Sequence, residues 1–337
     1  MRDYKIDTLR FIGLAAIILA HTSPPSFIFQ LRNFDVPLMV FISGLSFSIS
    51  YKNENFLSYL FKRAKRLIAP VWIFLTLYFG IQLLGGIHFE ALSLRKILES
   101  YFFLDGIGYV WIIRIFLIMA IVAPLINRML ENLDNASFFS TVILLLLISE
   151  VAIQYSLSLP LLGKNSIIGQ FLWYVVPYSV LLSLGMRIPK LTEKMQAIIA
   201  FSSLLVFLSI ALLFYFTEQH FVPTQLFKYP PRLYYLSYAV AVTLFIYLLL
   251  GPLKKLILGS TLLSKSITFI SQNSIWIYLW HIPFIKGIDA SFEKKYAFTF
   301  IAATVITFIQ VSLINYINQS DSVSSQTKRN LKIMLTG

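Results

Sequence analysis

The chain contains no cysteine. This absence excludes disulfide bonds, cysteine-ligated metal sites and a cysteine nucleophile, and it leaves the redox compartment undetermined. Charged residues are also scarce, at 13% of the 337 residues, whereas hydrophobic residues make up 58%. Soluble domains carry about 25% charged residues. The composition therefore indicates a protein that lies in a membrane.

The net charge of +13 needs a separate explanation, because basic proteins often bind nucleic acid. Such proteins present their Lys and Arg on a solvated face, whereas here most of these residues occupy short gaps between long apolar runs. We therefore expect no nucleic-acid partner and expect the lipid bilayer to be the main surrounding of the chain.

Apolar runs long enough to cross a bilayer, which takes about 20 residues each, recur about ten times along the chain. They cover residues 6–22, 35–51, 67–86, 109–127, 138–156, 170–187, 196–216, 233–251, 267–285 and 297–317, and Pro- and Gly-rich turns separate many of them. The predicted fold is an all-α, polytopic bundle of about ten transmembrane helices. Residues 1–317 form one membrane domain, and residues 318–337 form a short polar tail.

The loops predict the orientation of the bundle. Segments on the same side as the N-terminus hold more Lys and Arg than those on the opposite side, which places both termini in the cytoplasm. The first apolar run resembles a signal peptide, but Asp7 and Arg10 interrupt it and no small-residue cleavage site follows. We expect it to be retained as the first span.

Three ionisable residues share one face of this first span. Arg10 and His21 are separated by almost exact helical turns, and Asp7 lies within about 40° of His21 on the same helix. His21 would lie about 16 Å further out than Arg10. Charges that face lipid are costly, so the stripe should face the bundle interior or a wet cavity. The alternatives are an interfacial Asp7–Arg10 pair and an interfacial His21.

The next two spans carry further candidate positions. Ser43 and Gly44 fall near the middle of the second span, where small residues also serve helix packing. Arg63 and Arg66 share a face at the predicted cytoplasmic start of the third span. Their guanidinium groups suit phosphate, although basic residues at this place also satisfy the positive-inside rule.

These features together resemble acyltransferase family 3, the membrane proteins that O-acylate bacterial surface glycans. The resemblance rests on Arg10 and His21, on "FISG" at 41–44, on "RAKR" at 63–66, on "YPPRLYYLSY" at 229–238 and on "NSIWIYLWHIPF" at 273–284. It covers about residues 4 to 317. Larger members of the family append a soluble hydrolase-like domain, for which this chain has no room.

The resemblance implies a protein of the bacterial cytoplasmic membrane that uses acyl-CoA, most often acetyl-CoA, as donor and a surface glycan or lipid-linked sugar as acceptor. It makes His21 and Arg10 the central residues, with Asp7 beside them and no metal. Arg63 and Arg66 would engage the phosphates of CoA, with Ser43 and Gly44 also assigned to the donor site. A neutral His21 can take the proton of a sugar hydroxyl as its oxygen attacks the thioester. An acetyl-imidazole intermediate is the variant of this mechanism.

Four further polar residues are candidates for acceptor binding. Glu150 is an acidic residue well inside the fifth span, where it could orient His21, bind acceptor hydroxyls or bond to a neighbouring helix. Asn273, Tyr278 and His281 could line an acceptor groove near the outer face, with an interfacial aromatic cluster as the alternative.

Two other functions compete with acyl transfer. Ionisable residues inside helices also build the pathways of proton-coupled secondary transporters. Transporters commonly show two related halves, but the basic residues that open the third span have no counterpart in the second half of this chain. A non-catalytic scaffold would leave the stripe of Asp7, Arg10 and His21 unexplained. Membrane acyl transfer is the function that we expect.

Overall fold

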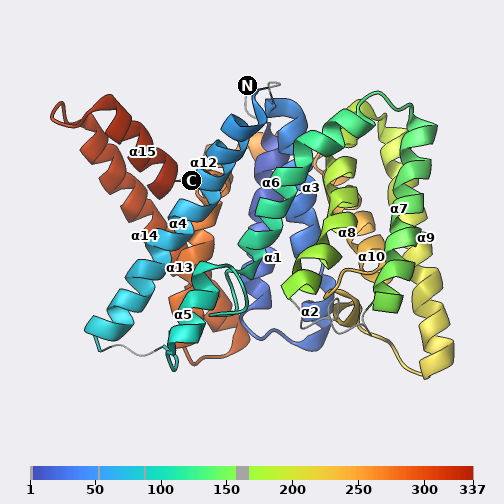
Figure 1. The fold of residues 1–337 in the computed structure, drawn as a ribbon, viewed down its shortest axis with the longest axis horizontal. Helices are drawn as coiled ribbons and strands as arrows, with labels where there is room; N and C mark the ends of the chain where they lie inside the picture. Colours follow the sequence, from blue (N-terminus) through green and yellow to red (C-terminus); the bar gives the residue numbers. More distant parts are fainter. Residues whose placement is uncertain (1–2, 52–53, 87–88, 157–166, 337) are drawn as a thin grey trace. The chain divides into compact units, whose positions relative to one another are not determined.

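The computed structural model describes residues 3–51, 54–86, 89–156 and 167–336. These residues form α-helices with two short 3-10 turns and contain no β-strand (Figure 1). The expectation of an all-α fold is confirmed.

Each predicted span has a helical counterpart. Nine of them are single helices: α1 (Tyr4–Ala20), α3 (Asp35–Ser50), α4 (Phe56–Leu84), α6 (Trp111–Leu130), α7 (Asn135–Ser156), α8 (Ile167–Arg187), α9 (Glu193–Glu218), α10 (Leu233–Leu249) and α14 (Phe292–Gln319). The span expected at 267–285 is instead two helices, α12 (Thr261–Gln272) and α13 (Ser274–Gly287), which are separated at Asn273. The shorter helices are α2 (Ser26–Leu31), α5 (Leu94–Tyr101), α11 (Lys254–Gly259) and α15 (Ser325–Leu335).

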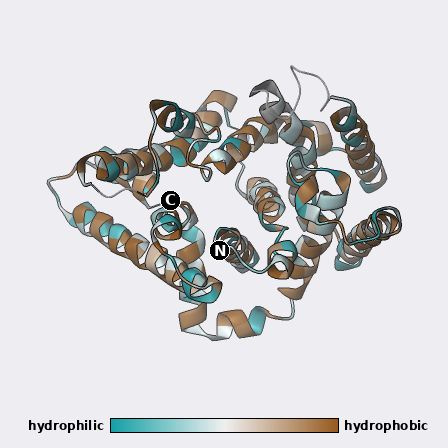
Figure 2. Ribbon diagram, turned by 90° about the horizontal axis from the view of Figure 1, so that it is seen from below, coloured by the Kyte–Doolittle hydropathy of each residue, from teal (hydrophilic) through white to brown (hydrophobic). Residues whose placement is uncertain are grey.

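Length and hydropathy mark many of these helices as membrane spans. Among the described residues, six segments are long and apolar enough to cross a bilayer: the α2–α3 segment Ser26–Ser50 and helices α4, α6, α7, α9 and α14. Hydrophobic residues, drawn in brown, are prominent on helices throughout Figure 2. Only 6% of the most apolar window of α9 is buried within the protein. Exposed apolar surface on this scale requires lipid, and the protein is a multi-pass membrane protein.

Polar caps set the ends of several helices. The side chain of Asn55 accepts hydrogen bonds from the backbone N–H groups of Leu57 and Ser58 at the start of α4, and Thr192 does the same for Met195 at the start of α9. Caps of this kind satisfy N–H groups that have no partner within the helix. The basic residues of α4 therefore fall in its first three turns, as the sequence predicts.

The chain divides into two compact units. Unit 1 contains Met1–Gly13, Ser26–Asn53 and Ile118–Ser260, and its main helix pairs are α3 with α8 and α9 with α10. A Cβ atom added to Gly44 would lie 2.0 Å from the carbonyl oxygen of Leu182, and one added to Gly185 would lie 2.1 Å from that of Phe41. Glycine at both positions lets α3 and α8 approach closely.

Unit 2 contains Leu14–Pro25, Glu54–Leu117 and Thr261–Gly337, so it includes the second half of α1. Helix α13 packs on α14 and α4, and α15 packs on α4 and α14. The region expected to be only a polar tail thus contains a helix. Three hydrogen bonds attach this helix to the rest of unit 2. Lys65 donates to the side chain of Asn330, Trp276 to the carbonyl of Met334, and Gln310 to the carbonyl of Leu335.

Candidate active site

His21 directly follows the last residue of α1 and belongs to unit 2. Two prolines come soon after it, at positions where a helix cannot continue regularly. Ser23, just before them, has a positive φ of 54°, so the chain turns sharply at this point. The end of the helix therefore fixes the place of the imidazole within the unit.

His21 and His281 form a hydrogen-bonded imidazole pair. Nδ1 of His21 lies 2.9 Å from Nε2 of His281. The two rings are almost parallel, with an interplanar angle of 16°. His281, on α13, is fully buried. The structure thus brings together two histidines that the sequence places in different predicted roles.

The partners of His281 determine which ring nitrogens carry protons. Nδ1 of His281 is hydrogen-bonded to the backbone carbonyl of Tyr278, and a carbonyl can only accept. In the neutral ring, Nε2 of His281 therefore has no proton and accepts a hydrogen bond from the Nδ1–H group of His21. It follows that Nε2 of a neutral His21 is the nitrogen with the lone pair, which is the atom that a general base needs.

Two tyrosines enclose the imidazole pair. The ring of Tyr109 meets that of His21 edge-on, with 4.8 Å between centroids, and Tyr278 stacks at an angle on His281. The hydroxyl of Tyr278 donates to the backbone carbonyl of Tyr109, at 2.6 Å. These contacts hold the loop before α6 against α13 and place an aromatic ring against each imidazole.

A second feature of unit 2 is a basic end formed by α4 and α15. Arg63, Lys65 and Arg66 lie in the first turns of α4, and the side chain of Arg63 contacts the ring of Tyr59. The hydrogen bond from Lys65 to Asn330, at 2.7 Å, brings α15 to this end. Helix α15 adds three basic residues to it: Lys328, Arg329 and Lys332.

A comparison with protein families matches residues 3–316 to the acyltransferase domain of acyltransferase family 3. The match covers nearly the whole chain. The chain belongs to acyltransferase family 3. No protein of curated function and no solved structure matches it. The resemblance that the sequence motifs indicate is confirmed, and the protein is a membrane acyltransferase.

In this family 3 acyltransferase the first half of the polar stripe lies in unit 1. Asp7 is buried, and Arg10 donates a hydrogen bond to the hydroxyl of Ser46 on α3, at 3.2 Å. Ser43 donates to the carbonyl of Met39 within α3. The close approach of Gly44 to α8 supports a packing role for that residue. The donor-site assignment of Ser43 and Gly44 stays a prediction.

The remaining predicted acceptor residues have defined partners. Glu150 accepts from the guanidinium of Arg232, with 2.6 Å to Nε, and from the backbone N–H of Leu233 at the start of α10. The carboxylate therefore caps α10, which accounts for its place inside an apolar helix. Asn273 donates to the carbonyl of Phe269 at the break between α12 and α13. Roles in acceptor binding stay predictions for both residues.

Two clusters of ion pairs in the acyltransferase were not predicted from the sequence. In unit 1, Asp35 accepts from Arg32 at 2.7 Å and from Lys228 at 2.9 Å, and all three side chains are buried. In unit 2, Glu90 binds Lys96 and Lys286. Each cluster joins a local pair to a lysine almost 200 residues away, Lys228 or Lys286, which helical periodicity does not connect. No group of three or more metal-binding side chains occurs in the described part of the chain.

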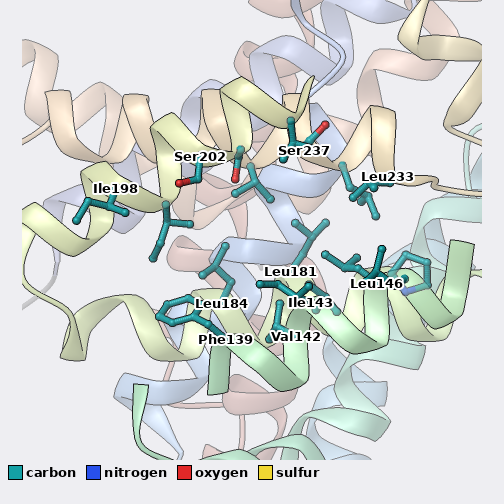
Figure 3. Close-up of a pocket in the computed structure, with 18 of the residues that line it drawn as sticks. Phe139, Val142, Ile143, Leu146, Leu181, Leu184, Ile198, Ser202, Leu233 and Ser237 are labelled. Carbon is teal, nitrogen blue, oxygen red and sulfur yellow. The ribbon is translucent and has the colours of Figure 1, made fainter. Parts of the chain in front are cut away.

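Figure 3 shows an apolar cavity of about 540 Å³ in unit 1. Its walls come from α7, α8, α9 and α10, and Leu146, Leu181 and Leu233 are among the residues that line it. Among the described residues of its lining, the polar side chains are serines, such as Ser202. Its described lining contains no ionisable side chain, whereas the imidazole pair of unit 2 can act as a base. The imidazole pair is therefore the candidate active site.

Proposed function

We propose that this protein transfers an acetyl group from cytoplasmic acetyl-CoA to a hydroxyl of a bacterial surface glycan or of its lipid-linked precursor. The observation that carries the proposal is the imidazole pair. It gives His21 a defined tautomer, with Nε2 as base, within a membrane acyltransferase.

The reaction requires one proton to be moved twice. Nε2 of His21 takes the proton of the acceptor hydroxyl as the oxygen attacks the thioester carbonyl. Collapse of the tetrahedral intermediate breaks the C–S bond, and the imidazolium returns the proton to the leaving sulfur of CoA. His281 accepts a hydrogen bond from His21 Nδ1–H throughout, and so keeps the base in orientation. His281 is then a positioning residue and not an acceptor-binding one.

Partial shielding of the site supports transfer to a sugar in preference to water, because His281 is fully buried and His21 is half-buried. The aromatic rings of Tyr109 and Tyr278 pack against the two imidazoles. Exclusion of bulk water limits the competing hydrolysis of the thioester.

The basic end of unit 2 fits the donor. CoA carries a pyrophosphate and a 3'-phosphate, which charged hydrogen bonds from Arg63 and Arg66 would hold. The positive-inside rule places this end in the cytoplasm, together with both termini. Arg10 and Asp7 remain candidate catalytic residues by the family resemblance, and transfer through an acetyl-His21 intermediate is the chemical variant.

One experiment tests the proposal as a whole. The purified protein in nanodiscs receives acetyl-CoA and the de-esterified envelope glycan of the source strain, and both CoA release and ester formation are measured. We expect equal amounts of each with the wild-type protein and neither with His21→Ala. Flux of a labelled substrate across proteoliposomes without thioester cleavage would instead establish a transporter.

A further inference from the structure

The apolar cavity of unit 1, shown in Figure 3, has no place in the mechanism above. Helix α7 packs on α8, and helix α9 packs on α10. Side chains of all four helices line the cavity, and all of its described lining belongs to unit 1. The cavity is therefore a feature of one compact unit.

The exposure of the lining residues depends on the helix that carries them. Leu181 on α8 and Leu236 on α10 are each 2% exposed. By contrast, Ile143 on α7 is 57% exposed and Ile198 on α9 is 54% exposed. The cavity is thus a groove, with α8 and α10 as its floor and α7 and α9 as its two rims.

This groove opens onto the surface that the protein presents to lipid. Both rim helices are long and apolar enough to span the membrane, and only 17% of the most apolar window of α7 and 6% of that of α9 are buried. The groove and the outer faces of these helices therefore form one continuous apolar interface with the bilayer. An empty groove would leave its lining without van der Waals partners, so hydrocarbon should fill it.

The length of the groove matches one leaflet. Its lining on α9 extends from Met195 to Val206, which is about 16 Å at about 1.5 Å per residue. The hydrocarbon core is about 30 Å thick, so this is about half of it. Phe139 and Met195 line the groove near the starts of α7 and α9, which the predicted orientation places at the cytoplasmic surface. The occupant therefore belongs to the cytoplasmic leaflet.

The charges near this end of the groove indicate the kind of headgroup. Lys190 and Lys194 are exposed around the start of α9, with Glu193 between them, and Glu131 and Asp134 are exposed just before α7. A zwitterionic phospholipid offers a phosphate to the lysines and an ammonium group to the carboxylates. A purely anionic carrier lipid would be repelled by the same carboxylates.

We propose that this groove binds one acyl chain of a zwitterionic phospholipid from the cytoplasmic leaflet. The chain lies between α7 and α9 on the floor that α8 and α10 form, and it completes the packing of the four helices. The site takes no part in acetyl transfer, so it stands independently of the proposed function.

Photo-crosslinking of the wild-type protein tests the occupant directly. The protein is placed in nanodiscs that contain phosphatidylethanolamine with a photoactivatable group in the middle of its acyl chain, and the labelled positions are mapped by mass spectrometry. We expect label on Leu181 and Leu236, because these floor residues are too buried to meet lipid that only surrounds the protein. Label confined to the outer faces of α7 and α9 would overturn the proposal.

Two groove-filling variants provide a second test. Ser202→Trp on α9 and Leu146→Trp on α7 place a large side chain in the groove from different walls. Binding of phosphatidylethanolamine to the delipidated, detergent-solubilised protein is followed by native mass spectrometry. Each variant should raise the half-saturating lipid concentration about tenfold or more, because two methylene groups left unburied already cost that much.

Leu208→Trp is the matched control. Leu208 lies on the same helix as Ser202 but about 120° away from it, and it is 50% exposed. Its variant should bind lipid as the wild type does. Unchanged binding in both groove variants would overturn the proposal, as would an equal loss in Leu208→Trp. Displacement of the phospholipid by a lower concentration of polyprenyl phosphate would overturn it as well, because the groove would then serve a lipid-linked acceptor.

Discussion

At the scale of single residues, the hydrogen bond between His21 and His281 explains why a histidine ends an apolar helix. The pair predicts different effects for the two rings. Loss of the base in His21→Ala should lower kcat by about 10²–10⁴-fold while acetyl-CoA binding persists. Ester formation, normalised to folded protein, measures this effect. Substantial turnover by the variant would assign the base to another group.

His281 allows a finer test, because its role depends on one acceptor atom. His281→Gln can place an amide oxygen near the position of Nε2 and should retain much of the activity. His281→Phe keeps the ring but has no acceptor, so we expect a fall in kcat without a change in the KM for acetyl-CoA. The kinetic constants of both variants test this, and equal activities would contradict the positioning role.

Glu90 provides a pH dependence at the same scale. Its pKa in the folded protein lies below the ordinary value because of Lys286 and Lys96, although burial opposes this. Its ionised form therefore stabilises the fold above about pH 4.3, the ordinary pKa of Glu. This contribution is lost as the pH falls through the lowered pKa. Glu90→Gln should melt below the wild type at pH 7, and the difference should close as the pH falls below the lowered pKa.

At the scale of helices, close packing of α3 on α8 predicts a sharp contrast between two glycines. Gly44→Ala would place a Cβ 2.0 Å from a backbone oxygen of Leu182, so the helices would have to separate. We expect a loss of about 1–3 kcal/mol. Gly80, inside α4, has no atom within 4 Å of an added Cβ. Gly80→Ala should gain roughly 0.5–1 kcal/mol. Thermal melting in detergent compares the two.

The buried ions of unit 1 predict a second effect on stability. Asp35→Ala would leave Lys228 and Arg32 buried without their carboxylate, at a cost of about 3–5 kcal/mol. Denaturant or thermal unfolding measures this loss. The double variant Asp35→Leu, Lys228→Met removes one charge of each sign and should recover part of it. A double variant as unstable as the single one would show that the loss does not come from unpaired charge.

The helices were more predictable from the sequence than the site was. Long apolar runs define spans because the bilayer imposes their length, and no neighbour needs to be known. Helix α15 was missed because its polar sequence becomes a helix through contacts with α4 and α14. The pairing of His21 with His281 joins residues far apart in the chain, which helical periodicity cannot detect. The motifs that carry the family resemblance nevertheless include both histidines, His21 in the first span and His281 in the segment 273–284.

At the scale of the whole molecule, the absence of cysteine allows a direct test of orientation. Ser291 and Ser320 flank α14 at its two ends and are exposed. Ser291→Cys should react with an impermeant maleimide in intact cells, because we place it outside. Ser320→Cys should react only after permeabilisation. The unsubstituted protein is the unreactive control, and the reverse pattern would invert the proposed topology.

The docking of α15 has a practical consequence for handling this protein. Lys65 binds Asn330, and the last turns of α15 receive hydrogen bonds from Trp276 and Gln310. Affinity tags and fluorescent reporters are commonly fused at the carboxyl end. Here such a fusion would pull on a helix that lies beside Arg63 and Arg66, so a weak response to acetyl-CoA from a carboxyl-tagged preparation could originate in the tag.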